Sequence, residues 1–200
     1  MKFLIGKKLG MTTLFDETKG ALNVTLISFT ENKVTATRSM EKNQYIAVQV
    51  ETAKTSKKTV RREFRLDKNG PKDTEDLSKV LEQYAEGTAL SIDQFEVGEK
   101  VNISGITKAK GFQGVVKRYN FRGAPASHGR KHDMRKPGSI GATFPEHVIK
   151  GRRMAGRMGG ENMTVRNLSV VYVNPSEGLI GVRGAVPGVN GRIVKVMTTK

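Results

Sequence analysis

The chain has 200 residues and a formal net charge of +16 at pH 7, from 35 Lys or Arg and 19 Asp or Glu. This length suits one or two domains. The excess positive charge favours a polyanionic partner, for which nucleic acid fits best, because no basic amphipathic helix is evident for a membrane surface. The lack of cysteine excludes disulfides, thiolate metal sites and a Cys nucleophile, and it suits a reducing compartment.

The first 37 residues predict short β-strands. The apolar run 3–5 is too short for a signal peptide, so a cytoplasmic protein is expected. A basic turn is expected at 6–10, where Lys7 and Lys8 would be either solvated or in contact with RNA phosphates. Runs rich in β-branched and apolar residues predict further strands; these lie at 11–15, 21–29 and 34–38.

Residues 38–92 differ in character and predict a small α+β insert. A strand is expected at 45–50, with Ile46, Val48 and Val50 on one face. A helix is expected from Asp73, its cap, to Gly87, its stop. Its apolar face would hold Leu77, Val80, Leu81 and Tyr84. The stretch 54–65 is basic with acidic neighbours, and the insert would serve packing or a protein contact.

Strand patterns return on both sides of a long central stretch. Val101 and Ile103 alternate within 93–105, and later strands are expected at 163–173, 179–183 and 193–197. The pair Asn190-Gly191 predicts a tight turn before the last of them. Short strands at close spacing indicate a small barrel or sandwich. We therefore expect a β body from 1–37, 93–105 and 161–200, the insert at 38–92, and an extension at 106–160.

We call residues 106–160 the basic extension. Within its positions 108–157 stand 13 Lys or Arg and two acids, a net of +11 out of the chain's +16. It has no hydrophobic period, and a loop of this length is normally functional or disordered. Its large apolar residues stand singly among glycines, which a merely solvated basic loop would not need. We expect a long irregular finger that enters a folded RNA, with Arg and Lys on phosphates.

Other chemistry is weakly indicated. His128, His132 and His147, with Asp133 and Glu146, could form a metal shell, but glycines and Pro137 disfavour the helix that the spacing requires. No metal is therefore predicted, and contacts of the histidines with RNA are preferred.

The Ser139 region lacks a nucleophile-elbow pattern, and the glycines at 156–160 lack the Lys-Ser/Thr of a phosphate-binding loop. We expect no enzyme activity, cofactor or small-molecule substrate.

Ordered motifs spread over nearly the whole chain carry a family resemblance. They are Gly-Lys-Lys-Leu-Gly-Met-Thr at 6–12, Lys-Gly-Phe-Gln-Gly at 110–114, Lys-Arg at 117–118, Phe121, Ser-His-Gly at 127–129, Pro-Gly-Ser-Ile-Gly at 137–141, Lys-Gly-Arg-Arg-Met-Ala-Gly-Arg-Met-Gly at 150–159 and Gly-Ala-Val-Pro-Gly at 184–188. In these motifs the chain resembles the bacterial form of the universal large-subunit ribosomal protein number three. Two departures are Ala109, where the family has Gly, and the lack of a Gln at 141–145, a residue that is methylated in some members.

The resemblance implies a mainly β fold. Its body would be a small translation-factor-like β-barrel with a small α+β insert and a long irregular basic extension. It implies a structural constituent of the large subunit that binds 23S rRNA near its 3′ end and supports early assembly. The extension would point toward the peptidyl transferase centre, and neighbouring large-subunit proteins would be further partners. The expected location is the ribosome in the cytoplasm, with an organellar ribosome as the alternative.

The residues expected to contact rRNA combine phosphate-binding cations with glycines, histidines and apolar side chains that could lie against bases. They are Lys7, Lys8, Lys108, Lys110, Gly111, Phe112, Lys117, Arg118, Phe121, Arg122, His128, Gly129, Arg130, Lys131, His132, Arg135, Lys136, Gly138, Ser139, Gly141, Lys150, Arg152, Arg153, Met154 and Arg157. The alternative functions are a free RNA chaperone or nucleoid-type protein, and an rRNA-modifying enzyme, for which no cofactor pocket is evident.

Overall fold

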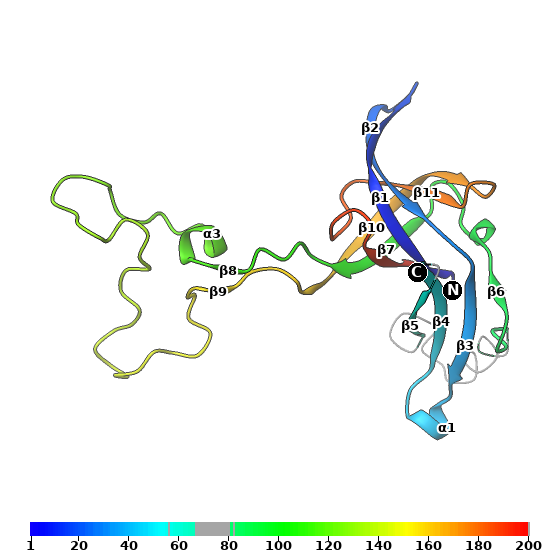
Figure 1. The fold of residues 1–200 in the computed structure, drawn as a ribbon, viewed down its shortest axis with the longest axis horizontal. Coiled ribbons are helices and arrows are strands. Elements are labelled where there is room, and N and C mark those ends of the chain that lie inside the picture. Colours follow the sequence, from blue (N-terminus) through cyan, green and yellow to red (C-terminus); the bar gives the residue numbers. More distant parts are fainter. Residues whose placement is uncertain (56, 67–80, 82, 200) are drawn as a thin grey trace. The chain divides into compact units, whose positions relative to one another are not determined.

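The computed structural model describes residues 1–55, 57–66, 81 and 83–199. The chain divides into two compact units, one formed by Met1–Thr107 with Asn162–Lys200 and the other by Lys108–Glu161. The second unit covers nearly all of the basic extension and carries that name below. The regular secondary structure of the described residues is mainly β-strand (Figure 1), which confirms the mainly β prediction.

Six antiparallel strands of the first unit form a closed barrel in the order β1-β12-β7-β10-β11-β2. Each strand pairs with two neighbours, and β2 pairs with β1 to close the circuit. Their bounds are β1 (Phe3–Asp16), β2 (Gly20–Ser28), β7 (Lys100–Ile106), β10 (Asn162–Asn174), β11 (Leu179–Arg183) and β12 (Ile193–Thr198).

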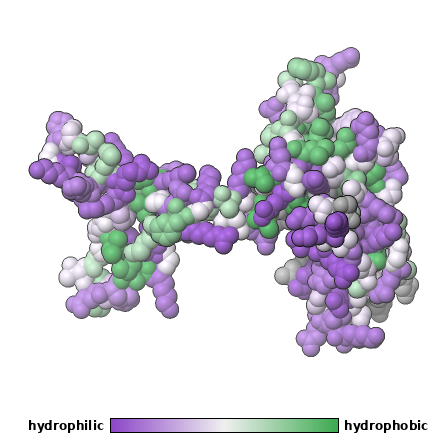
Figure 2. Space-filling model, in the orientation of Figure 1, coloured by the Kyte–Doolittle hydropathy of each residue, from purple (hydrophilic) through white to green (hydrophobic). Residues whose placement is uncertain are grey.

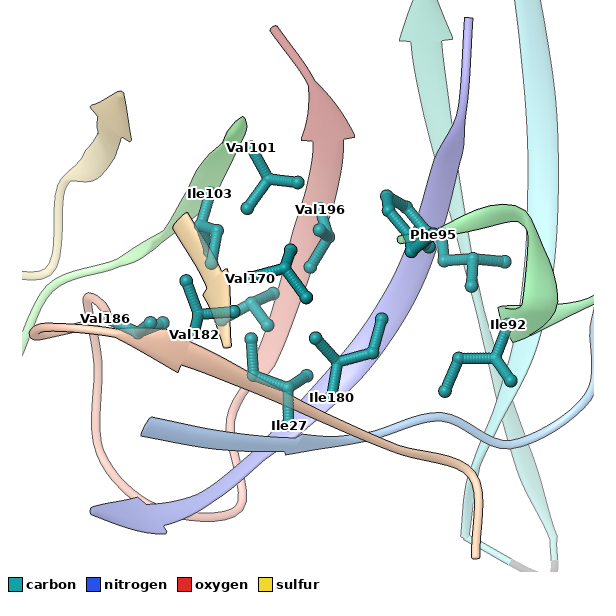
Figure 3. Close-up of a cluster of buried hydrophobic side chains, with 12 residues drawn as sticks. Ile27, Ile92, Phe95, Val101, Ile103, Val170, Ile180, Val182, Val186 and Val196 are labelled. Carbon is teal, nitrogen blue, oxygen red and sulfur yellow. The ribbon is translucent and has the colours of Figure 1, made fainter. Parts of the chain in front are cut away.

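Alternating apolar side chains fill the barrel. Val101 and Ile103 of β7 and Val194 and Val196 of β12 are buried within one hydrophobic cluster. Figure 3 shows side chains from several strands of this cluster meeting in the interior. The short 3-10 helix η1 (Ile92–Gln94) adds Ile92 to the same cluster. Removal of this apolar area from water is the main stabilising term for the barrel.

Strand β1 is continuous where a basic turn was predicted at 6–10. The strand runs through this stretch with a bulge between Lys8 and Gly10. Gly6 meets a packing requirement there, because an added Cβ would lie 2.5 Å from Ile27 Cγ2 and 2.8 Å from the Phe29 ring. The turn prediction is therefore wrong, because the glycines serve close packing and a bulge instead of a reversal of the chain.

A second sheet of four strands has the order β5-β4-β3-β6. Its strands are β3 (Asn32–Arg38), β4 (Ala47–Thr55), β5 (Lys58–Arg65) and β6 (Ala89–Leu90), and a single-turn helix α1 (Met40–Asn43) joins β3 to β4. Residues up to 37 were predicted to belong to the body, whereas β3 pairs with β4 and β6 of this sheet. It also did not predict β5, whose basic residues alternate with few apolar ones.

The first strand joins the barrel to the four-stranded sheet. Leu4 lies in the barrel cluster, whereas Phe3 and Ile5 lie in a second cluster with Val34, Val48, Val50 and Phe64. The period of two along a strand explains this division. The buried Asn32 side chain accepts from the Ile5 amide at 3.0 Å and donates to the Ile5 carbonyl at 3.1 Å. The Asn32 side-chain amide thus bonds both the N–H and the carbonyl of Ile5, as the backbone of a neighbouring strand would do.

The expected helix from Asp73 to Gly87 falls largely outside the described residues. Leu77 and Val80, two of its four predicted apolar positions, belong to that part. The other two, Leu81 and Tyr84, pack against the second cluster, and the Tyr84 hydroxyl donates to the Met1 carbonyl at 2.6 Å. Gly87 has a φ of 89°, a value that favours glycine.

Candidate nucleic-acid interface

The basic extension begins and ends with a short antiparallel stem. Strand β8 (Phe112–Gln113) pairs with β9 (Gly156–Arg157). Beside it, the Lys110 amide donates to the Met158 carbonyl at 2.9 Å, and the Met158 amide donates to the Gly111 carbonyl at 2.9 Å. The two limbs therefore meet in a defined register, although the sequence reading expected no regular structure in this unit.

Glycine at 159 allows the two limbs to approach. Gly159 has a φ of 74°, and a Cβ placed on it would overlap the backbone carbonyl oxygen of Lys108. Ala109, where the family resemblance suggested that glycine is usual, is not among the residues with positive φ. The alanine at 109 therefore does not disturb the stem.

A short helix and one arginine organise the part next to the stem. Helix α3 (Val115–Tyr119) ends at Asn120, which has the left-handed φ of 58°. Half-buried Arg118 donates from Nη1 to the Met154 carbonyl at 2.8 Å, and its guanidinium lies 4.9 Å from the Tyr119 ring centroid. A Cβ at Gly156 would lie 2.6 Å from the same nitrogen, so a side chain there would displace the Arg118 guanidinium from this position. Arg118 thus links the two limbs and is not a freely solvated cation.

The outer loops are held by backbone groups and polar side chains. The Ala124 amide donates to the Met134 carbonyl at 3.1 Å, and Arg152 Nη2 donates to the Ser139 carbonyl at 2.8 Å. Because Val115 is the only buried apolar residue of this fully described unit, hydrophobic burial contributes little to its shape. Its conformation depends on hydrogen bonds and on backbone positions with positive φ.

Twelve of the thirteen predicted cations in this unit are exposed to solvent; Arg118 is the thirteenth. The twelve are Lys108, Lys110, Lys117, Arg122, Arg130, Lys131, Arg135, Lys136, Lys150, Arg152, Arg153 and Arg157. Of these, Lys136 forms an ion pair with Asp133 at 3.0 Å. The surface of the basic extension can therefore present many separate donors to phosphate groups.

The predicted neutral contact residues lie among these cations. Exposed members are Gly111, Phe112, His128, Gly129, His132, Gly138, Ser139 and Gly141, whereas Phe121 and Met154 are half-buried. Phe112 exposes 76% of its surface and Phe144 exposes 87%. Figure 2 shows hydrophobic and hydrophilic residues interspersed over this unit. Exposed aromatic side chains between cations can stack on bases while the cations bind phosphates.

The histidines do not form a metal centre. His128 and His132 are both exposed and both have positive φ, at 61° and 59°. Among the residues that the structure describes, no group of three or more His, Asp or Glu is placed to hold a metal ion. Their exposure leaves both rings accessible to an RNA surface.

The two lysines near the start of the chain have different environments. Lys7 is exposed, as a phosphate contact would require. Lys8 is only 7% exposed, and its Nζ donates to the carbonyls of Val186 at 2.8 Å and Gly188 at 3.1 Å. The prediction that Lys8 contacts rRNA is therefore wrong. Its ammonium instead fixes a loop of the barrel, an arrangement that the adjacent pair of lysines in the sequence does not reveal.

No helix in the described part of the chain is long and apolar enough to cross a membrane.

Comparison with known proteins gives matches along the chain. The sequence model of the family described as "Ribosomal protein L3" matches residues 5–179. A protein of Leifsonia xyli subsp. xyli named "Large ribosomal subunit protein uL3" is 46% identical over 201 residues, covering 96% of this chain and 92% of that protein. A protein of the same name from Chlorobaculum tepidum is 40% identical over 207 residues, covering 100% of this chain and 99% of that protein.

Proposed function

The chain belongs to the ribosomal protein L3 family, and on this premise we propose that it is a constituent of the large ribosomal subunit that binds 23S rRNA. Members of this family are structural components of the ribosome and not enzymes. The proposal makes the basic extension the principal RNA contact. Its residues would bind RNA through their charge and their placement along the extension, and they would catalyse no reaction.

The surface of the basic extension is the observation that carries this proposal. Twelve exposed cations surround exposed aromatic and aliphatic side chains, while only Val115 is buried. Exposing rings such as Phe112 and Phe144 to water adds no stability to the free protein. A folded RNA, by contrast, offers bases on which the rings can stack and phosphates that the cations can bind. Arg and Lys together with exposed aromatic rings therefore suit an RNA interior better than an extended, uniformly charged polyanion.

The family relationship extends the proposal to assembly and position. The extension would reach toward the peptidyl transferase centre, with the turn at 138–145 closest to the catalytic RNA. The body would bind rRNA early in subunit assembly and contact neighbouring large-subunit proteins. The protein would then reside in ribosomes, which are cytoplasmic in bacteria.

Co-sedimentation tests the function. A tagged full-length chain is expressed in bacterial cells, and ribosomal subunits are separated on sucrose gradients after a high-salt wash. We expect the chain at about one copy per large subunit and ultraviolet crosslinks confined to a few sites in 23S rRNA. The variant Arg152→Ala with Arg153→Ala should be retained less well, because two phosphate-binding candidates on the returning limb are lost together with the Arg152 bond to the Ser139 carbonyl.

A free RNA chaperone or nucleoid-type protein would behave differently. It would remain in the upper fractions or distribute over many RNAs and DNA, and its crosslinks would show no preferred 23S sites. Such a result would contradict the proposed role in the large subunit.

A further inference from the structure

A hollow in the first unit is lined by a half-buried lysine, Lys195 of β12. The hollow has a volume of about 560 Å³, and Arg62 of β5, Ser104 of β7 and Thr164 of β10 also line it. None of the described residues that line it is Asp or Glu. A water molecule occupies about 30 Å³ in the liquid, so the hollow has room for a molecule of several non-hydrogen atoms.

The amine of Lys195 is held in one place. Its Nζ donates to the Glu63 backbone carbonyl at 3.0 Å and lies 5.3 Å from the centroid of the Phe64 ring. An exposed lysine, by contrast, moves among many rotamers of its four-carbon stem. When the amine is neutral, one N–H can keep the bond to the Glu63 carbonyl, and the lone pair of the nitrogen then remains available to a bound molecule.

The surroundings of this amine favour its neutral form. Burial, followed by the positive charge of Arg62, keeps the pKa of Lys195 below its ordinary value, although the Glu63 carboxylate acts in the opposite direction. That carboxylate pairs with Arg38 at 3.5 Å and accepts from the Tyr45 hydroxyl at 3.3 Å. Desolvation and a neighbouring cation are the two means by which proteins make a lysine nucleophilic.

Arg62 provides an anion-binding group beside this amine. Its side chain is exposed, and its Nη1 donates to the Arg61 carbonyl at 3.0 Å, so Nε and Nη2 supply donors for a ligand. A guanidinium binds two oxygens of a phosphate group through parallel N–H bonds. The hydroxyl oxygens of Ser104 and Thr164, which are 2.7 Å apart, add hydrogen-bonding groups to the same hollow. The hollow therefore combines a nucleophile with donors for a phosphate group.

We propose that Lys195 is a site of acylation by small acyl phosphates, such as acetyl phosphate, which bind in this hollow through Arg62. In this step the neutral Nζ attacks the carbonyl carbon of the acyl phosphate. The bond between that carbon and the phosphate oxygen breaks, and inorganic phosphate leaves with the electron pair. One N–H proton of the amine passes to water, and an amide remains. The step requires no oxidant, reductant or second enzyme.

This modification is independent of the proposed function, because it concerns the free protein and involves no RNA. Acylation would remove the positive charge of Lys195 and with it the attraction of the ammonium to the Phe64 ring. An amide N–H can still donate to the Glu63 carbonyl, so the strand pairing around β12 should remain intact.

The test incubates the full-length chain with acetyl phosphate and follows the acetylation of individual lysines by mass spectrometry. Lys100 of β7, an exposed lysine of the same unit that does not line the hollow, is the internal reference. We expect the initial rate at Lys195 to be at least about threefold higher than at Lys100, although Lys195 is less exposed. A rate at Lys195 equal to or below that at Lys100 would overturn the proposal.

Two arginine variants then test the anion-binding group. Arg62→Gln should lower the rate at Lys195 at least about threefold and leave Lys100 unchanged. Arg166→Gln, which removes an exposed arginine of β10 outside the hollow, should change neither rate. Thermal melts check that both variants fold. Equal rates at Lys195 in the two variants would contradict the role of Arg62.

A second acyl donor separates binding of the phosphate group from activation of the amine. With an acetyl thioester that carries no phosphate, Arg62→Gln should affect Lys195 less, because no phosphate group has to be held. Inorganic phosphate should slow the reaction of the unaltered chain with acetyl phosphate at Lys195 but not at Lys100. If Arg62→Gln has the same effect with both donors and inorganic phosphate does not compete, the hollow is not a site for acyl phosphates.

Discussion

Replacement of Gly159 by alanine should open the stem of the basic extension. The alanine would have to keep a φ of 74°, and its Cβ would overlap the Lys108 carbonyl oxygen. The left-handed conformation costs about 1–2 kcal/mol for a residue with a Cβ. Overlap with a backbone atom adds about 1–3 kcal/mol, because it forces the chain to shift. The stem should therefore lose roughly 2–5 kcal/mol.

Amide hydrogen exchange measures this loss at the stem itself. The amides of Lys110 and Met158 bond across the two limbs at 2.9 Å, so they report on opening of the stem. Their protection should fall at least about twentyfold, since each 1.4 kcal/mol corresponds to a factor of ten. Affinity for 23S rRNA should fall as well, while its salt slope stays constant because no charge is removed.

Two other glycines serve as matched controls. Gly151 has a φ of 83° with nothing within 4 Å of an added Cβ, so alanine there meets only the conformational cost. Gly141 has neither a positive φ nor a close neighbour, so alanine there should be neutral. If Gly159→Ala retains the same protection of the Lys110 and Met158 amides as Gly141→Ala, the argument from the close approach of the limbs is refuted.

Three further outcomes are expected. Lys8→Met should lower the free energy of unfolding by about 2–4 kcal/mol, because two buried carbonyls lose their donor; denaturant unfolding checks this, and an equal loss in Lys7→Met would contradict it. Gly141→Asp should slow large-subunit maturation or alter inhibitor binding at the peptidyl transferase centre, because the added carboxylate would repel RNA phosphates, and it should leave the melting temperature of the free protein unchanged. Normal subunit assembly and normal inhibitor sensitivity would show that this turn is not near the catalytic RNA. Limited trypsin should cut the isolated protein first within 117–157, where hydrophobic burial is slight, and equal resistance of the barrel and this segment would refute that order.

Much of the organisation follows from local patterns in the sequence. Local runs of β-branched and apolar residues predicted strands near those observed at β2, β11 and β12, and the alternation of Val101 and Ile103 predicted β7, because both signals depend only on neighbouring residues. The charge concentrated at 108–157 is a property of composition alone. It requires no knowledge of which strands are neighbours, and it led directly to RNA as the partner class.

The tertiary structure decided where individual groups are buried. Lys7 and Lys8 are adjacent and chemically identical, yet only Lys8 reaches carbonyls of a loop about 180 residues later, as its sequence separations of 178 and 180 show. Likewise, Arg61 pairs with Glu51, whereas the next residue, Arg62, lines a hollow together with Lys195 of β12. Sequence patterns determine which face of a strand a side chain occupies, but the partner on that face depends on strand order and register. Strand order and register are set by the packing of distant segments. They therefore decide which lysines and arginines are buried and which remain exposed and available to RNA.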